Sequence, residues 1–292
     1  TTTEETTTEE TTTEESTTEE ITTEETTTEE EMTTEETTTE ETTTEESTTE
    51  KPIPVSTPKV GESFKDTKTK AQYKITGKQT VSYIKTTATS GKVTIPATVA
   101  YKGKTFKVTA IYKGAFKNKT GITAVTFGKN IISVGSEAFS GCKKLKTVTL
   151  NASLKTIGNK TFYKCTSLTQ IKLGSKVTTI GTSAFAGCTK LKKATLNAKL
   201  TTIGNAAFSK CTALTSITIP KNVNKIGKQA FYLCKKLKSI TINTTKLKSS
   251  NIGSNAFKGI HAKATIKVPK SKKTAYIKLL KSKGAGKNVT YK

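Results

Sequence analysis

Residues 135–150 read GSEAFSGCKKLKTVTL, residues 158–173 read GNKTFYKCTSLTQIKL, and residues 181–196 read GTSAFAGCTKLKKATL. Each stretch begins 23 residues after the one before it, and Gly, Phe, Cys and Leu keep the same places in all three. A fixed period of this length is typical of proteins built from stacked structural repeats. The sequence therefore predicts a repeat solenoid, in which each unit contacts mainly its two neighbours.

The period extends over seven units, each marked by one phenylalanine: Phe116, Phe139, Phe162, Phe185, Phe208, Phe231 and, after a three-residue insertion, Phe257. A cysteine follows three residues later in the five inner units: Cys142, Cys165, Cys188, Cys211 and Cys234. Stacking places equivalent residues of neighbouring units in contact, so we predict that these residues form a structural ladder in the interior. Cysteine serves there as a small buried apolar side chain, because a spacing of 23 residues does not suit a metal finger.

Each unit also carries an apolar pair nine and eleven residues after its phenylalanine, such as Val148 and Leu150 or Ile171 and Leu173. This alternation predicts a short strand with one buried face. The residue after the pair is Gly, Asn or Pro, which favours a tight turn. We expect the segment around each phenylalanine to make a single helical turn.

The Gly–Ala–Phe–Cys–Leu register resembles the BspA-like class of leucine-rich repeats, which are surface proteins of bacteria and some protozoa. The resemblance covers about residues 108–268. It implies a curved, strand-rich solenoid on an exported surface protein of a kind often implicated in adhesion to host components. Tyr112 in place of the glycine, and Lys119 and Ile260 in place of the cysteine, depart from the register in the outer units, as expected beside caps.

The ends of the repeat region have their own patterns. Residues 70–110 show short alternating strands, which predict a small antiparallel cap sheet at the N-terminal face. The repeats themselves occupy residues 111–268, in about seven units. Residues 269–292 are predicted as a C-terminal cap helix and tail, because apolar residues recur at helical spacing between Ser271 and Lys283.

Residues 1–50 contain 26 Thr, 20 Glu, two Ser, Ile21 and Met32. Such a segment cannot bury enough apolar surface to fold, so we expect a disordered acidic stalk. Two alternatives stay open, namely O-glycosylation of the threonines and screening of the basic region by the carboxylates. Residues 51–69 begin with several prolines and are predicted as a linker.

Charge narrows the possible chemistry. Residues 51–292 hold all 48 basic residues, every one a lysine, against three acids, which gives a net charge of +45. The acids are Glu62, Asp66 and Glu137, and His261 is the only histidine. Hydrolysis by paired carboxylates and metal binding by clustered ligands are therefore disfavoured. We expect a protein that is not an enzyme and that uses no cofactor and no metal.

Lysines gather at the positions four, five and seven residues after the phenylalanine. Stacking should align them in a basic ridge, which we define as Lys143, Lys144, Lys146, Lys190, Lys192, Lys235, Lys236 and Lys238. Lys172 and Lys193 add charge on the exposed face of the strands, and we count them with the eight ridge lysines as candidate ligand-binding residues. Two interpretations stay open. The lysines keep the protein soluble and monomeric by self-repulsion, or they form a binding surface for anionic glycans or acidic proteins.

The sequence disfavours two other kinds of binding surface. Specific nucleic-acid recognition relies on arginine and exposed aromatic residues, whereas arginine is absent and seven of the ten phenylalanines belong to the predicted ladder. Outward strand positions are rich in threonine, as in ice-binding solenoids, but Lys172 and Lys193 interrupt that row. No run approaches about 20 apolar residues, so no transmembrane segment is predicted.

Together these features predict a non-enzymatic binding or adhesion module, extracellular or on the cell surface, with a protein or an anionic glycan as its partner. A structural spacer of the cell envelope is one alternative. The other is a targeting module of a larger protein whose active domain lies outside this sequence. Neither an export signal nor an anchor is visible in the sequence.

Overall fold

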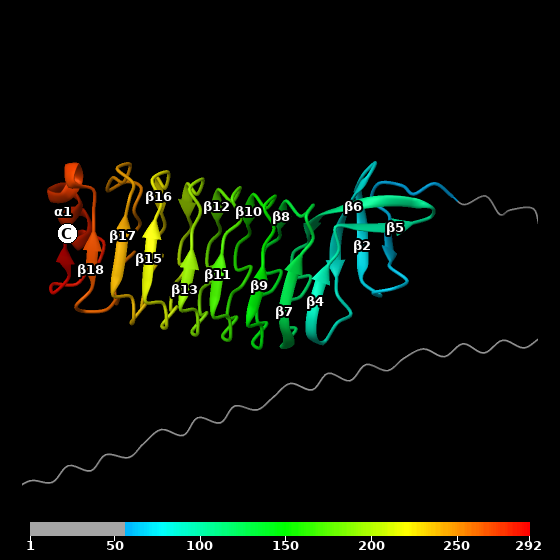
Figure 1. Ribbon diagram of the computed structural model, residues 1–292, viewed down its shortest axis with the longest axis horizontal. Helices are drawn as coiled ribbons and strands as arrows, with labels where there is room; N and C mark the ends of the chain where they lie inside the picture. The colour runs from blue at the N-terminus through cyan, green and yellow to red at the C-terminus, as the bar shows by residue number, and fades with distance from the viewer. Residues whose placement is uncertain (1–55) are drawn as a thin grey trace, which may run out of the picture. The chain divides into compact units, whose positions relative to one another are not determined.

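The structure is a computed structural model that describes residues 56–292, so the stalk predicted for residues 1–50 lies outside the described part. The described residues form a β-solenoid of about nine turns, with mostly parallel strands and a single helix at the C-terminal end (Figure 1). The predicted solenoid, its antiparallel N-terminal strands and its C-terminal helix are confirmed.

One row of strands runs along the solenoid as a parallel sheet. Its first members are β3 (Thr80–Lys85) and β6 (Lys104–Ile111). Each following coil adds two residues: β8 (Ser133–Val134), β10 (Thr156–Ile157), β12 (Thr179–Ile180), β14 (Thr202–Ile203) and β16 (Lys225–Ile226). These short strands were not predicted, because two residues are too few to show an alternating pattern.

The second row contains the strands that the apolar pairs predicted, and Figure 1 shows them side by side. A sheet of three holds β4 (Ser90–Ile95), β7 (Gly121–Phe127) and β9 (Thr147–Thr149). A sheet of six holds β11 (Gln170–Lys172), β13 (Lys193–Thr195), β15 (Ser216–Ile219), β17 (Ser239–Ile242), β18 (Thr265–Lys267) and β19 (Thr290–Tyr291). The row is therefore divided between β9 and β11.

The segment around each phenylalanine is a run of turns, so the predicted single helical turn is wrong. In the coil of Phe139, the N–H groups of Glu137, Phe139 and Gly141 donate to carbonyls of the next coil at 2.8 Å. The intervening N–H groups reach only three residues back, and Glu137 has a φ of 59°. An α-helix needs every N–H to bond four residues back, and the bonds between coils prevent that.

The N-terminal end differs from its predicted boundaries in two ways. Strand β1 (Ser63–Lys65) pairs antiparallel with β2 (Gln72–Gly77), although residues 51–69 were predicted as a linker. The sequence predicts that β4 belongs to the antiparallel cap sheet. In the structure it pairs parallel with β7 instead. The hairpin of β5 (Thr98–Tyr101) with β6 lengthens this coil beyond 23 residues and hides its repeat. Parallel stacking therefore begins near residue 80. For this reason the structure has about nine turns, whereas the 23-residue period shows only seven units.

The interior is filled by like side chains in contact. The seven repeat phenylalanines are fully buried, and consecutive rings stack with centroids 4.7–5.6 Å apart. The glycine four residues before six of the seven rings lets the coils approach closely. A Cβ added at Gly181 would lie 2.7 Å from the backbone of Gly158 and Asn159. A larger residue at this position would force the coils apart.

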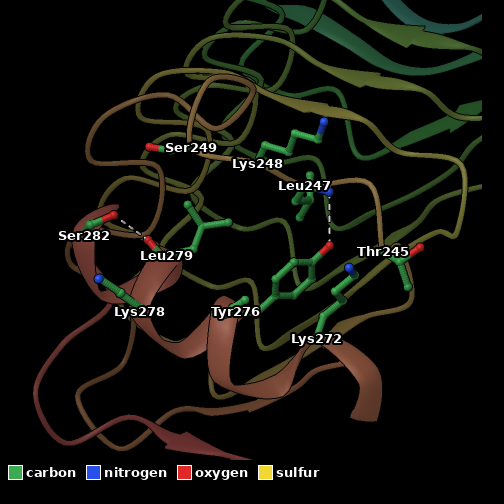
Figure 2. A pocket seen from close by; sticks show the side chains of 10 residues that line it. Thr245, Leu247, Lys248, Ser249, Lys272, Tyr276, Lys278, Leu279 and Ser282 are labelled. Carbon is green, nitrogen blue, oxygen red and sulfur yellow. Dashed lines mark hydrogen bonds between the residues drawn. The ribbon is translucent and has the colours of Figure 1, made fainter.

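The C-terminal end is covered by a short 3-10 helix (Lys270–Lys272) and by α1 (Lys273–Ser282). Tyr276 and Leu280 are the buried residues of α1. The Tyr276 hydroxyl accepts the N–H of Leu247 at 3.0 Å (Figure 2). It also donates to the carbonyl of Thr244 at 3.0 Å. These bonds fix the helix to the loop that contains the three-residue insertion.

Candidate functional site

The five cysteines lie inside the solenoid, one in each of five successive coils, and all are buried free thiols. Each Sγ donates to the carbonyl of a phenylalanine in the preceding coil at 3.1 Å, as Cys188 does to Phe162. Burial raises the pKa of Cys142, Cys188 and Cys234 to about 12. A thiol that is both protonated and inaccessible is a poor nucleophile and a poor metal ligand, so the row is a packing device.

All ten lysines singled out in the sequence have exposed side chains. The ridge positions five and seven residues after each phenylalanine lie on either side of a buried leucine: Leu145, Leu191 or Leu237. Because the leucine points inward, its two lysine neighbours point away from the core. The eight ridge lysines occur in three coils, and threonine, serine or alanine takes these slots in the coils between.

The two strand lysines lie where the second row of strands is divided. Lys172 of β11 pairs with Thr195 of β13, and Lys193 of β13 pairs with Gln170 of β11. A cavity of about 330 Å³ opens here, lined also by Thr147 and its neighbours on β9. The structure thus places the two lysines beside amide and hydroxyl groups over an apolar floor. The cavity contains none of the eight ridge lysines, so Lys172 and Lys193 form a site of their own beside the ridge.

Lys143 of the ridge has neighbours that the sequence did not single out. It shares a cavity of about 410 Å³ with Lys117, Lys160, Lys164 and Tyr163. The lysines at these turn positions vary from unit to unit, so the repeat pattern gave no signal for them. The stacking of coils alone brings them together.

A second feature missed by the sequence is a groove between α1 and the loop after β17. Its volume is about 430 Å³, and Leu247, Leu279 and Tyr276 line it together with Lys248 and Lys272 (Figure 2). The three-residue insertion before Phe257 was visible in the sequence and could have indicated an altered loop here. The apolar character of the groove depends on the orientation of α1, which could not be predicted from the sequence.

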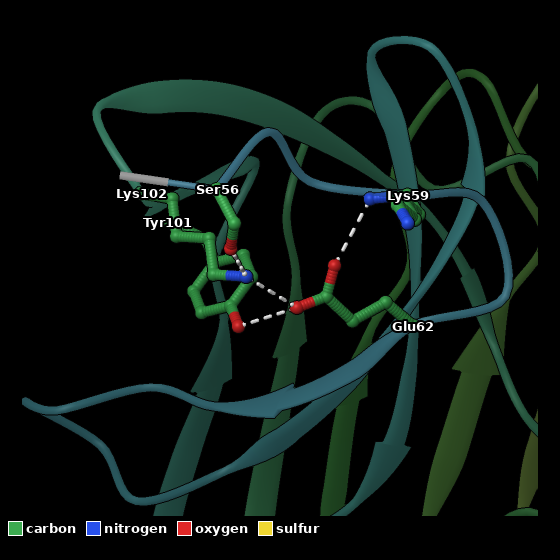
Figure 3. Close-up of polar contacts among 5 residues, drawn as sticks. All are labelled: Ser56, Lys59, Glu62, Tyr101 and Lys102. Carbon is green, nitrogen blue, oxygen red and sulfur yellow. Dashed lines mark hydrogen bonds and ion pairs between the residues drawn. The ribbon is translucent and has the colours of Figure 1, made fainter. Parts of the chain in front are cut away.

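The acids of the described residues all bind partners other than the ridge lysines, although Glu137 lines the same cavity as Lys143. Glu62 accepts bonds from Lys102 Nζ at 2.8 Å, from the Lys59 N–H at 2.9 Å and from the Tyr101 hydroxyl at 2.7 Å (Figure 3). These bonds, that of Lys102 foremost, lower the pKa of Glu62 to about 2.

The other two acids have nearby partners as well. Asp66 accepts bonds from Thr69, and Glu137 binds Lys117 and Lys160. In residues 56–292 the ion pairs involve Glu62 and Glu137 only. The ridge lysines therefore have no carboxylate partner within the described part of the chain.

The described residues contain neither a membrane-spanning helix nor a cluster of metal ligands. No helix among them is long and apolar enough to cross a bilayer. No group of three or more His, Cys, Asp or Glu side chains among them could hold a metal ion.

The comparison with known families decides the class of protein. Residues 109–238 and 201–283 match the family described as BspA type leucine rich repeat region, with six copies of the repeat. The chain belongs to the BspA-type leucine-rich repeat family. The resemblance stated from the Gly–Ala–Phe–Cys–Leu register is thereby confirmed. The curated proteins include none that matches this BspA-type chain.

Two solved structures of bacterial leucine-rich repeat proteins are similar to this chain. A leucine rich cell surface protein from Faecalibacterium prausnitzii A2-165 is 28% identical with a TM-score of 0.50, over 65% of this chain and 56% of that one. A leucine-rich repeat protein from Bacteroides ovatus ATCC 8483 is 26% identical with a TM-score of 0.47, over 68% of this chain and 57% of that one. The chain thus spans little more than half the length of these two proteins.

Proposed function

We propose that residues 56–292 form a non-enzymatic binding module of a cell-surface protein, and that the basic ridge binds an anionic partner such as an acidic glycan or an acidic matrix or host protein. The observation that carries this proposal is the row of eight exposed lysines without a carboxylate partner in the described residues. Lysine provides a mobile, strongly hydrated point charge, which suits attraction to a flexible polyanion.

Family membership and surface charge support the proposal in different ways. The similar protein from Faecalibacterium prausnitzii is described as a cell surface protein. An exposed solenoid with a net charge of +45 attracts anions over several ångströms and raises their local concentration. If the lysines served solubility alone, removing those of the ridge would affect binding no more than removing other lysines.

The test compares two variants with equal changes in charge. The first replaces Lys143, Lys144, Lys190, Lys192, Lys235 and Lys236 by Gln. The matched control replaces six lysines from other slots that are also exposed: Lys176, Lys199, Lys210, Lys221, Lys225 and Lys228. We expect the ridge variant to bind anionic glycans or matrix proteins more than about tenfold more weakly, because several ion pairs are lost, and the control to change little.

Binding is measured on glycan and matrix-protein panels at physiological salt and then as a function of salt concentration. The ridge variant should also show a flatter salt dependence, since fewer counterions are displaced. Equal losses in both variants would assign the lysines to general solubility. No saturable ligand in either panel would favour the alternative of a structural spacer of the cell envelope.

A further inference from the structure

The ridge has a period of two coils, twice that of the repeat. The slot seven residues after the phenylalanine holds Thr or Lys in strict alternation. Backbone bonds connect this slot from coil to coil at 2.8–3.4 Å, through Thr123, Lys146, Thr169, Lys192, Thr215 and Lys238. The three lysines are therefore aligned in one column, with a threonine coil between each pair.

The slot five residues after the phenylalanine follows the same alternation. It holds Lys144, Ser167, Lys190, Ala213 and Lys236 in successive coils. Every second coil thus presents a pair of exposed lysines on either side of its buried leucine. The intervening coils present the exposed hydroxyl-bearing residues Thr169 and Thr215. Positive charge and hydroxyl groups therefore alternate along the solenoid.

The spacing of the charges restricts the kind of polyanion that fits. Neighbouring strands lie about 4.8 Å apart, so successive lysine pairs are separated by roughly 10 Å. Phosphates along one nucleic-acid strand follow every 3.4 Å or so, about three times too closely. Side chains on the same face of an extended acidic peptide recur about every 6.8 Å. Such a peptide therefore also fails to match the spacing of successive lysine pairs after one step.

We propose that the basic ridge recognises a linear acidic glycan that carries one anionic group per disaccharide and lies along the solenoid axis. The length of an extended disaccharide is comparable with the two-coil step. An acidic sugar would then face each lysine pair, and the neutral sugar would face Thr169 or Thr215. This inference rests on the proposed function and adds the class of glycan and its direction.

The decisive experiment moves one lysine pair by one coil without changing composition or charge. The shifted variant carries S167K, T169K, K190S and K192T, at positions on the surface loops. Its three lysine pairs then lie in the coils of Phe139, Phe162 and Phe231. The first two pairs are one coil apart, and the last two are three coils apart. The probe is a hyaluronan octasaccharide, which has one carboxylate per disaccharide, and its affinity is measured by calorimetry with the full chain.

We expect the shifted variant to bind the octasaccharide about fivefold more weakly, because two exposed ion pairs with the glycan are lost. Heparin, whose charges are denser, should bind both proteins equally and serves as the matched probe. Equal affinity of the two proteins for hyaluronan would overturn the two-coil register while leaving an anion-binding ridge. If the original protein binds neither glycan, both the register and the proposed function are wrong.

Discussion

Between Phe139 and Phe231 every coil repeats after 23 residues, whereas at the N-terminal end Thr80 pairs with Lys107 and Ser90 with Gly121. In the middle, each buried side chain meets its own equivalent in the next coil. At the ends the partners are unique. The hydroxyl of Tyr276 and the carboxylate of Glu62 belong to such contacts, which no other coil repeats.

This difference assigns separate tasks to the two kinds of region. The middle gains stability from one set of apolar contacts made many times, as expected for a solenoid whose neighbours supply the interface energy. The ends must cover the last apolar edges with whatever side chains the shorter segments offer. Tyr83 does so for the ladder by stacking on Phe116 at a centroid distance of 5.2 Å. The three predictions below test whether the regions respond to different perturbations.

The largest effect is expected from alkaline pH, which acts on the middle. The pKa of the buried thiols is raised to about 12 for Cys142, Cys188 and Cys234, whereas a thiol of the unfolded chain has a pKa near 9. Stability due to these groups is complete below pH 9 and falls as the pH rises toward 12. The loss is about 1 kcal/mol per thiol for each pH unit above 9.

Urea unfolding followed between pH 8 and pH 11 measures this loss. The control is a variant in which all five cysteines are replaced by serine, which keeps a donor for the phenylalanine carbonyl and does not ionise in this range. Its free energy of unfolding should depend less on pH. Equal slopes in the two proteins would show that the thiols are accessible in the folded state.

A smaller effect is expected from widening one interface between middle coils. In Gly181→Ala the new Cβ meets the backbone of Gly158 and Asn159, and rigid backbone cannot move aside locally. We expect a loss of about 3 kcal/mol in the free energy of unfolding. Gly286→Ala is the matched control, because a Cβ there has no atom within 4 Å. Similar melting temperatures for the two variants would contradict the close approach of coils.

The smallest effect is expected at the N-terminal end under acid. Bonds from Lys102, Lys59 and Tyr101 lower the pKa of Glu62 from 4.5 to about 2. Its contribution is complete above pH 4.5 and is lost as the pH falls toward 2. Amide exchange of β1 and β2 should therefore accelerate in that window before the middle coils respond. Glu62→Gln should reduce the acid dependence, of which Asp66 with its lowered pKa keeps a part, and an NMR titration giving Glu62 an ordinary pKa would refute it.

The same contrast explains what the sequence could predict. Strict repetition made the phenylalanine and cysteine positions readable, because one rule accounts for every unit. The parallel pairing of β4 with β7 was missed, since the hairpin of β5 and β6 changes the spacing at that point. The turns around each phenylalanine were misassigned because their N–H groups bond to another coil, which local sequence does not reveal.

The candidate site was predictable to a similar degree. Exposure of the ridge lysines followed from their places beside an inward leucine. The cluster of Lys117, Lys160, Lys164 and Tyr163 around Lys143 depends on which turns come into contact, and the groove under α1 depends on the orientation of the helix. Neither is encoded in a single unit.

The alternation of lysine and threonine coils has a consequence for how such a gene can lengthen. Duplication of one 23-residue unit within the ridge would place two like coils in succession and invert the phase of every charge beyond it. Duplication of a 46-residue pair would preserve the phase and extend the same surface. Growth by pairs is therefore the route that keeps the pattern intact.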